Sequence, residues 1–221
     1  MIILQKTSKD LWAKGDKQGA VKVLVAAIEK TPAQLDNYLE LAAYLNALKD
    51  TQQAEKLLQS ALVRFPDNQD LLYSLGTTYY AAGDYAKALT QFQQVTLPRL
   101  ENDKLYMLAS TYYAQQDYAH ALAFAVTAQQ HEPQRTDVNL LVGDLFLALG
   151  DFSHAATYYG QVLTQEPKSA AANFKVGLAR LAQGLSNEAY FEKAKQLDAA
   201  YFAQEKHRLS DIERYLKAQQ K

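Results

Sequence analysis

Four histidines are the side chains of this sequence best suited to metal binding or to acid–base chemistry near neutral pH. They are His120, His131, His154 and His207, and none belongs to an HExxH zinc motif. His120 and His154 occupy equivalent places of a repeat, so we expect them roughly 8–10 Å apart, the distance between packed helix axes. The nitrogens of two histidines that bind one zinc ion lie about 2.0–2.1 Å from the metal, so side chains this far apart do not share one zinc ion. The sequence therefore favours solvated histidines over a metal site.

Carboxylates recur at one place of that repeat, which is typical of structural caps. Asp84 and Asp117 each precede an expected helix, where an aspartate accepts hydrogen bonds from free N–H groups. An acid–base pair would instead need two perturbed carboxylates in one cleft. The sequence has no GxxxxGK[ST] phosphate loop and no cysteine, which excludes disulfides, thiolate ligands and a cysteine nucleophile. We predict no catalytic residue, no metal, no cofactor and no enzymatic activity.

The charge of the chain is balanced. Its 23 Lys and Arg residues stand against 24 Asp and Glu residues, a net charge of −1, so it lacks the basic field that attracts nucleic acids or anionic membranes. No apolar run approaches the roughly 20 residues of a membrane-spanning helix, and the first residues, MIILQKTSKD, do not form a signal peptide. The absence of cysteine is typical of a reducing compartment. We expect a soluble, cytoplasmic protein that binds neither nucleic acid nor membrane.

Pairs of short helices must position these side chains. Within residues 72–98, apolar residues at helical spacing form two stripes separated by Gly83 and Asp84. Small residues stand where the two helices approach, because a bulky side chain there would overpack the crossing by about 1–3 kcal/mol. In the first helices this small position recurs every 33 or 34 residues as Ser8, Ala42, Gly76, Ala109, Gly143 and Gly177. In the second helices it recurs as Ala20, Ala54, Ala88, Ala121, Ala155 and Ala189.

Turn residues repeat with the same period. The expected N-caps of the second helices are Asp16, Asp50, Asp84, Asp117 and Asp151. Gly15, Gly83 and Gly150 precede three of them and suit the left-handed residue that ends a helix. Proline stops a helix, and it stands just past each expected second helix as Pro32, Pro66, Pro98, Pro133 and Pro167.

With this period and these columns, the sequence resembles the tetratricopeptide repeat family. Large residues at matching places, such as Leu75, Tyr79 and Phe92, add to the resemblance, which covers nearly the whole chain. It implies an all-α fold: a right-handed superhelical α-solenoid of about six helix-turn-helix units plus a C-terminal capping helix. The expected units are residues 1–34, 35–68, 69–101, 102–135, 136–169 and 170–201, followed by a capping helix over residues 202–221.

The end of the chain departs from the pattern. In the sixth unit Leu185 replaces the capping aspartate, and the apolar residues after Ala189 come about two positions early. We therefore expect a shortened or rotated second helix. The final segment carries a stripe of Phe202, Leu209, Ile212 and Leu216, typical of a helix that covers the last repeat.

In this family the first helices line an inner groove, and the resemblance implies that the second, fifth, ninth and twelfth residues of each unit point into it. These positions hold Asp70, Tyr73, Thr77 and Tyr80, then Asp103, Tyr106, Ser110 and Tyr113, flanked by Trp12, Asp36, Asn46, Asp137, Asp144 and Phe174. Tyrosines combine contact area with a polar group. They also pack between helices, and aspartates in a first turn complement the helix dipole, so structural roles stay open. An acidic, aromatic groove predicts a protein partner, namely a peptide or helix with basic or apolar anchors.

Several functions fit this architecture. Some family members clamp the C-terminal carboxylate of a chaperone with lysine, asparagine and arginine, but the matching places here hold Tyr73, Thr77, Met107 and Asp137, which disfavours such a ligand. The leading hypothesis is a non-enzymatic interaction scaffold. The alternatives are a self-assembling structural subunit that uses Ile2, Ile3 and the Phe202 helix, and a peptide-responsive regulatory domain. The sequence does not decide the oligomeric state.

Overall fold

The computed structural model describes residues 7–219, all of which are helical or lie in turns and connections. The chain divides into two compact units, Met1–Met107 (unit 1) and Leu108–Lys221 (unit 2). Ile2 and Ile3, two of the three contacts expected for self-assembly, lie outside the described residues. No helix of the described part is long and apolar enough to cross a membrane.

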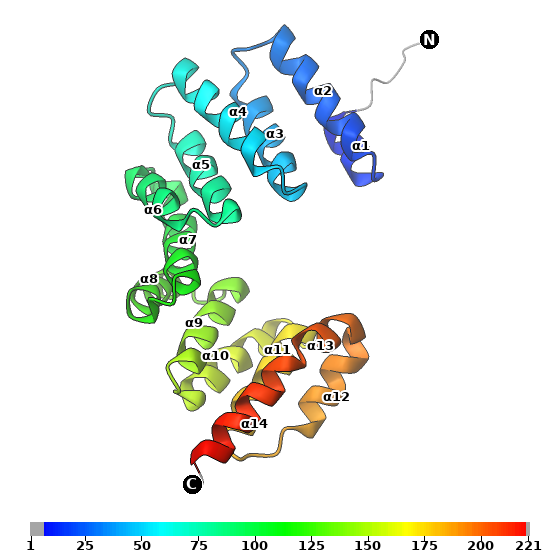
Figure 1. The fold of residues 1–221 in the computed structure, drawn as a ribbon, viewed down its shortest axis with the longest axis vertical. Helices are drawn as coiled ribbons and strands as arrows, with labels where there is room; N and C mark the ends of the chain where they lie inside the picture. Colours follow the sequence, from blue (N-terminus) through cyan, green and yellow to red (C-terminus); the bar gives the residue numbers. More distant parts are fainter. Residues whose placement is uncertain (1–6, 220–221) are drawn as a thin grey trace. The chain divides into compact units, whose positions relative to one another are not determined.

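Unit 1 is built from consecutive helix pairs. Its elements are α1 (Ser8–Ala13), α2 (Lys17–Lys30), α3 (Leu35–Ala47), α4 (Thr51–Arg64), α5 (Gln69–Ala82), α6 (Tyr85–Gln94) and the 3₁₀ turn η1 (Pro98–Leu100). Helix α7 (Glu101–Ala114) contains the boundary between the units. Within unit 1 each helix packs on the next, and the first helices α3 and α5 also touch each other (Figure 1).

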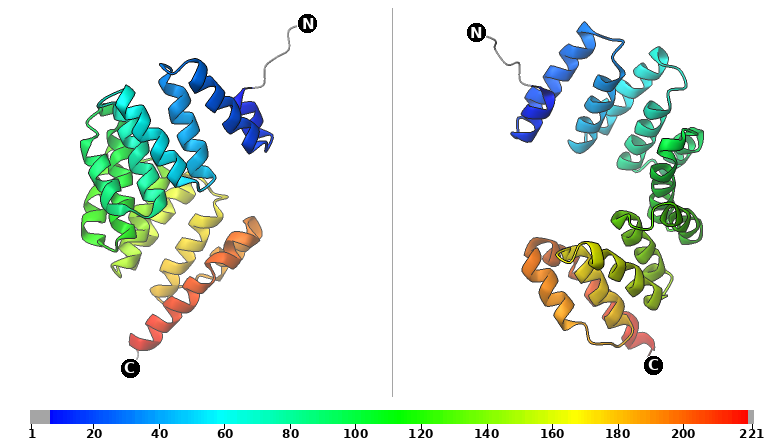
Figure 2. Two further views of the ribbon diagram at one scale, coloured as in Figure 1. Left: turned by 45° about the horizontal axis from the view of Figure 1, so that its top comes forward. Right: turned by 180° about the vertical axis from the view of Figure 1, so that it is seen from behind.

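Unit 2 continues the same arrangement. After the end of α7 come α8 (Tyr118–His131), α9 (Thr136–Ala148), α10 (Phe152–Gln165), α11 (Ala170–Ala182), α12 (Glu188–Leu197), α13 (Ala199–Glu205) and α14 (His207–Gln219). Successive helices again pack on one another, as the second view of Figure 2 also shows for α9 to α12. Stacked antiparallel helix pairs of this kind confirm the predicted all-α, α-solenoid fold class.

The predicted caps define where the second helices begin. Each of the five aspartates accepts a hydrogen bond from the backbone N–H three residues later, at 2.9 Å for Asp16 and up to 3.3 Å for Asp84 and Asp117. The residue before each aspartate has a positive φ where it is Gly15, Gly83 or Gly150. Lys49 and Gln116 take the same left-handed conformation with φ of 62° and 63°, although side chains other than glycine are strained there. The turn geometry is therefore kept even where glycine is absent.

Prolines end the second helices as expected. Pro32, Pro66, Pro133 and Pro167 each follow the C-cap residue of α2, α4, α8 or α10. Pro98 behaves differently, because α6 stops after 10 residues at Gln94 and Pro98 opens the 3₁₀ turn η1. A proline that arrives early thus produces a shorter helix and an extra turn.

Glycine in the first helices makes room for an aromatic ring on the second. A Cβ added at Gly76 would lie 2.6 Å from the ring of Phe92, and one at Gly177 would lie 2.6 Å from the ring of Phe191. Gly143 faces the ring of Tyr159 in the same way. At the matching position of the second repeat the small residue is Ala42, and the residue that corresponds to Phe92 is Leu58, which is fully buried. At this position of the first helix, glycine therefore faces an aromatic ring and alanine faces the smaller leucine.

The sixth pair departs from the pattern, as predicted. Helix α12 has only 10 residues, and its N-cap Asn187 makes no side-chain capping bond. Phe191 contacts Gly177, whereas Ala189 is exposed. The assignment of Ala189 to the buried alanine column is therefore wrong: the helix is shifted by two residues, so that Phe191 takes the place that Tyr159 has in the preceding pair.

The C-terminal segment also differs from expectation. Instead of one helix from residue 202, α13 begins at Ala199 and α14 at His207, with Lys206 between them. The expected apolar stripe is confirmed in part, since Phe202, Leu209 and Ile212 pack against Phe174, Leu178 and Ala194. Phe202 is thereby engaged within unit 2, which argues against the predicted role of its helix as an assembly contact. The side chain of Leu216 lies outside the described residues.

Candidate functional site

One stripe of helix α5 carries the predicted groove residues of unit 1. Asp70, Tyr73, Thr77 and Tyr80 follow one another at intervals of three or four residues, and all four are partly exposed. Such spacing places them on one face of the helix, while Leu71, Leu75 and Tyr79 on other faces are buried. The four side chains therefore form one partly exposed stripe, and their role in ligand binding stays a prediction.

The charge of this stripe is lower than predicted, because Asp70 has an ionic partner. Arg99, in η1, donates two hydrogen bonds from one nitrogen to the Asp70 carboxylate oxygens, at 2.5 and 2.7 Å. The Arg99 side chain is 60% exposed and that of Asp70 24%. Asp70 also lies in the first turn of α5, where it complements the helix dipole. Sequence reasoning missed Arg99, which stands in the irregular turn that the early Pro98 creates.

The tyrosines of the stripe combine exposure with packing. The ring of Tyr73 lies 5.7 Å from that of Phe92, and that of Tyr80 lies 5.8 Å from that of Tyr85. Burial, and to a lesser extent Tyr85, raises the pKa of Tyr80 above its usual value of 10.0. Thr77 donates its hydroxyl hydrogen to the Ser74 carbonyl at 2.7 Å. The tyrosines are thus held in place by neighbouring rings and still present part of their surface to solvent.

Three further predicted residues belong to unit 1. Asn46, at the end of α3, donates from Nδ2 to the Thr78 hydroxyl at 2.9 Å, so it links two first helices. Asp103 and Tyr106 lie in the first half of α7 and are half-buried. Asp103 stands in the first turn, as expected from the dipole argument.

The predicted residues of unit 2 differ in exposure, and the Asp137 side chain is 45% exposed. Ser110 is buried with only 7% of its surface exposed, so its assignment to a ligand-facing position is wrong. Tyr113 packs 5.6 Å from Tyr118, and burial followed by the Asp144 charge raises its pKa. Asp137 is paired with Arg135, whose Nε donates to it at 2.9 Å.

Asp144 is the centre of a largely buried ionic network. Its carboxylate accepts hydrogen bonds from the Lys175 ammonium and, at 2.8 Å, from the Tyr159 hydroxyl. Arg208 of α14 lies 3.7 Å away and also pairs with Glu205 at 3.3 Å. Asp144 and Lys175 are only 16% and 11% exposed. Two negative and two positive groups meet here, so the network is neutral overall, and a carboxylate expected to attract a ligand is already compensated within the chain.

The groups around this network are desolvated. Burial, with the nearby Asp144 charge, raises the pKa of Tyr159 well above its ordinary value. Burial followed by Glu205 raises the pKa of Tyr201 to about 12. Both phenols therefore stay neutral hydrogen-bonding groups at physiological pH.

The sequence analysis did not identify either cation of the network, Lys175 or Arg208, although the sequence around Lys175 is informative. Lys175 is the single charged residue in the first nine residues of α11, among alanine, phenylalanine, valine and glycine, and a buried lysine needs an anionic partner. Phe174, expected beside the groove, is fully buried beneath α13 and α14. Arg208 carried no comparable signal, because the residues around it on α14 are mostly polar.

Two of the four histidines lie beside capping aspartates and are exposed, as expected for solvated side chains. His120 and His154 lie 2.7 and 2.6 Å from Asp117 and Asp151 through Nδ1, and their rings stack on Tyr112 and Phe146. Among residues 7–219 no group of three metal-ligating side chains is gathered at one place.

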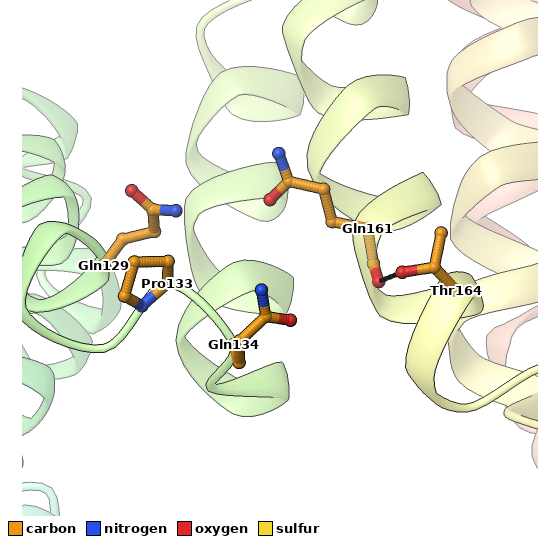
Figure 3. Close-up of a pocket in the computed structure, with 5 residues that line it drawn as sticks. All are labelled: Gln129, Pro133, Gln134, Gln161 and Thr164. Atoms are coloured by element: carbon orange, nitrogen blue, oxygen red, sulfur yellow. Dashed lines mark hydrogen bonds between the residues drawn. The ribbon is translucent and has the colours of Figure 1, made fainter.

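One polar hollow is lined by none of the predicted groove residues. It has a volume of about 230 Å³ and lies between the end of α8, the start of α9 and the end of α10 (Figure 3). Its walls are Gln129, Pro133, Gln134, Gln161 and Thr164, and the Thr164 hydroxyl is turned to the Gln161 carbonyl at 2.7 Å. It carries no charged side chain in its lining, so nothing in it fixes the chemistry of a ligand.

Family comparisons identify the class of protein. Two tetratricopeptide repeat families match, one over residues 45–111 and the other over residues 6–68 and 140–202. The chain therefore belongs to the tetratricopeptide repeat family, whose members bind other proteins or peptides. No curated protein matches the sequence.

Solved structures share the fold. PilW, described as a widely conserved type IV pilus biogenesis factor, has 17% sequence identity and a TM-score of 0.75, with 88% of this chain and 90% of that chain covered. PilF of Pseudomonas aeruginosa has 17% identity and a TM-score of 0.73, with 90% and 93% covered. YrrB, described as a TPR protein with an unusual peptide-binding site, has 19% identity and a TM-score of 0.59, with 81% and 94% covered. At these identities the likeness concerns the fold alone.

Proposed function

We propose that the protein is a non-enzymatic scaffold whose first helices bind a peptide or a helical segment of another protein. The observation that carries this proposal is the α5 stripe, in which Asp70, Tyr73, Thr77 and Tyr80 stay partly exposed along the whole helix. Helix α3 packs beside α5 and adds the exposed Asp36. We call the surface formed by Asp36 and the α5 stripe the α3/α5 face.

The chemistry of this face selects the kind of partner. Tyrosine rings held by neighbouring rings offer contact area at little cost in side-chain entropy. Because Arg99 already pairs with Asp70, the net negative charge of the face comes from Asp36. The partner should therefore combine apolar anchors with a basic residue, and the apolar anchors should contribute more of the affinity.

The proposal is tested by capture of partners with a matched pair of variants. Asp36→Lys with Thr77→Lys places two cations on the α3/α5 face. The control is Glu29→Lys with Thr90→Lys, on the exposed surfaces of α2 and α6, where Thr90 donates to a helix carbonyl as Thr77 does. Partners captured by the wild-type chain and identified by mass spectrometry should be lost with the first variant and kept with the control.

The helical circular dichroism signal should be the same for all three chains. Equal capture by both variants would remove the α3/α5 face from the function, and loss with both would show that the effect is one of net charge.

A further inference from the structure

The C-terminal segment lies on the last helix pair of unit 2. Helices α13 and α14 both contact α11, and α13 also contacts α12, as Figure 1 shows. The segment follows α12 directly, since Asp198 is at once the C-cap of α12 and the N-cap of α13. A single residue therefore separates it from the preceding pair.

Aromatic and aliphatic anchors attach this segment. The Phe202 ring meets the Phe174 ring edge to face at 5.6 Å, and Leu209 and Ile212 belong to the same cluster. Phe174 is fully buried in this arrangement. No residue from 199 to 212 is fully buried, so the segment rests on the surface of α11 and α12.

One basic side chain of the segment, Arg208, reaches beyond α11 to α9. Arg208 extends from α14 to Asp144 of α9, at 3.7 Å, although α14 packs on α11. A helix that only covers the end of a stack needs an apolar face and a polar face, and has no need of an arginine placed against a largely buried carboxylate on a different helix. Asp144 and Phe174 are also two positions that the sequence assigned to the ligand groove. The segment thus supplies the basic and apolar anchors expected of a partner.

We propose that the surface of α9 and α11 around Asp144 and Phe174 is a helix-binding site, and that residues 199–212 occupy it in place of a partner. The partner is a helical segment of another protein that carries an aromatic residue, an arginine six residues later, and aliphatic residues one and four positions after the arginine, as in Phe202, Arg208, Leu209 and Ile212. The inference rests on the proposed function and names the partner of a second face.

Competition within the chain follows from this arrangement. While the resident segment is bound, only the fraction of molecules in which it has detached can take a partner, and the apparent affinity falls by that fraction. Weakening the resident segment should therefore strengthen binding of a free helix of the same sequence.

The test uses the full chain and a fluorescein-labelled peptide of residues 198–219. Arg208→Glu in the chain sets a negative charge against Asp144 and Glu205, and it should raise the affinity for the native peptide about tenfold over the wild-type chain. Arg214→Glu is the matched control on the same helix, because Arg214 is 78% exposed and pairs with Asp211 three residues away; it should leave the affinity unchanged. Arg208→Gln, a milder change, should give an intermediate increase if the reversed charge impairs folding.

The affinity of the peptide must depend on the same anchor residues. Against the Arg208→Glu chain, a peptide carrying Arg208→Glu or Phe202→Ala should lose most of its affinity, and one carrying Arg214→Glu should keep it. Absence of binding to every chain, or equal binding of all peptides, would overturn the proposal. If the wild-type chain forms a dimer that the peptide dissociates, the partner is a second copy of this chain. That result would overturn the assignment of another protein as the partner. None of these outcomes affects the capture test on the α3/α5 face, which lies in unit 1.

Discussion

The α3/α5 face of unit 1 and the α9/α11 face of unit 2 come from the same repeat positions but are in different states. On α5, four predicted residues remain partly exposed, and the ion pair of Asp70 involves a mostly exposed arginine. On α9 and α11, Asp144 and Phe174 are covered by the chain's own C-terminal segment and its Arg208.

The repeat pattern thus determines which positions face outward, but not which of them stay uncovered. Residues outside the repeat columns decide that question. Arg99 stands in an irregular turn and Arg208 in a helix after the last repeat. An equivalent position can therefore be partly exposed in one unit and covered by the chain's own C-terminal segment in the other.

The largest expected effect comes from removing the Asp144 carboxylate of the α9/α11 face, and Asp70 of the α3/α5 face provides the comparison. Asp144→Ala removes the carboxylate that pairs with the largely buried Lys175, while Arg208 keeps Glu205, and it should lower the free energy of unfolding by about 3–5 kcal/mol. Asp70→Ala breaks an exposed pair and should cost about 0–1 kcal/mol. Urea unfolding followed by circular dichroism measures both. Similar losses for the two variants would contradict the difference in burial between the faces.

A smaller effect is expected from the glycines that accommodate aromatic rings. Gly76→Ala should destabilise unit 1 by about 1–2 kcal/mol, because the new Cβ meets the Phe92 ring and the clash outweighs the gain in helix propensity. Adding Phe92→Leu reproduces the Ala42 and Leu58 combination of the second repeat and should recover most of the loss. Thermal unfolding of the single and double variants tests this coupling. Additive losses would mean that the ring and the glycine do not act on each other.

The helix pairs could be predicted from the sequence because their signals are local and repeated. Each capping aspartate, each proline and each small residue acts within its own pair, so a period of 33 or 34 residues was enough to locate them. The error at Ala189 has a physical cause. The sixth pair lacks a capping aspartate, and the Phe191 ring contacts Gly177 in a register shifted by two residues.

The candidate site was less predictable, because its electrostatics depend on contacts between distant residues. Asp144 and Arg208 are far apart in sequence, and neither lies in a motif that links them. Ser110 has the type and the column position of a groove residue, yet it is buried. Repeat position alone therefore overstates the exposed, acidic character of the site.

The turns allow a stabilising change in each unit. Lys49 in unit 1 and Gln116 in unit 2 have the left-handed conformation that glycine has in the other turns. Replacing either with glycine should raise the free energy of unfolding by about 0.5–1 kcal/mol, since relief of backbone strain exceeds the added entropy of the unfolded chain. Gly83→Ala is the reverse change and should be destabilising. Equal stability of Lys49→Gly and the wild-type chain in urea would argue against strain at this turn.

The smallest expected effect concerns acid, and it tests what the two units share. Hydrogen bonds from the side chain and then the backbone N–H of Lys87 or His120 hold the pKa of Asp84 or Asp117 below 3.8. A carboxylate with a lowered folded-state pKa contributes stability above its unfolded pKa, and this contribution is lost as the pH falls through the folded value. Asp84→Asn and Asp117→Asn keep an oxygen for the capping bond but carry no charge, so each should lower stability slightly at pH 7 and reduce the fall in melting temperature below about pH 4. Because the backbone capping bond is the same in both units, the two variants should act on a single cooperative transition. Two transitions, each sensitive to only one of the variants, would show instead that the open and the occupied face belong to units that unfold separately.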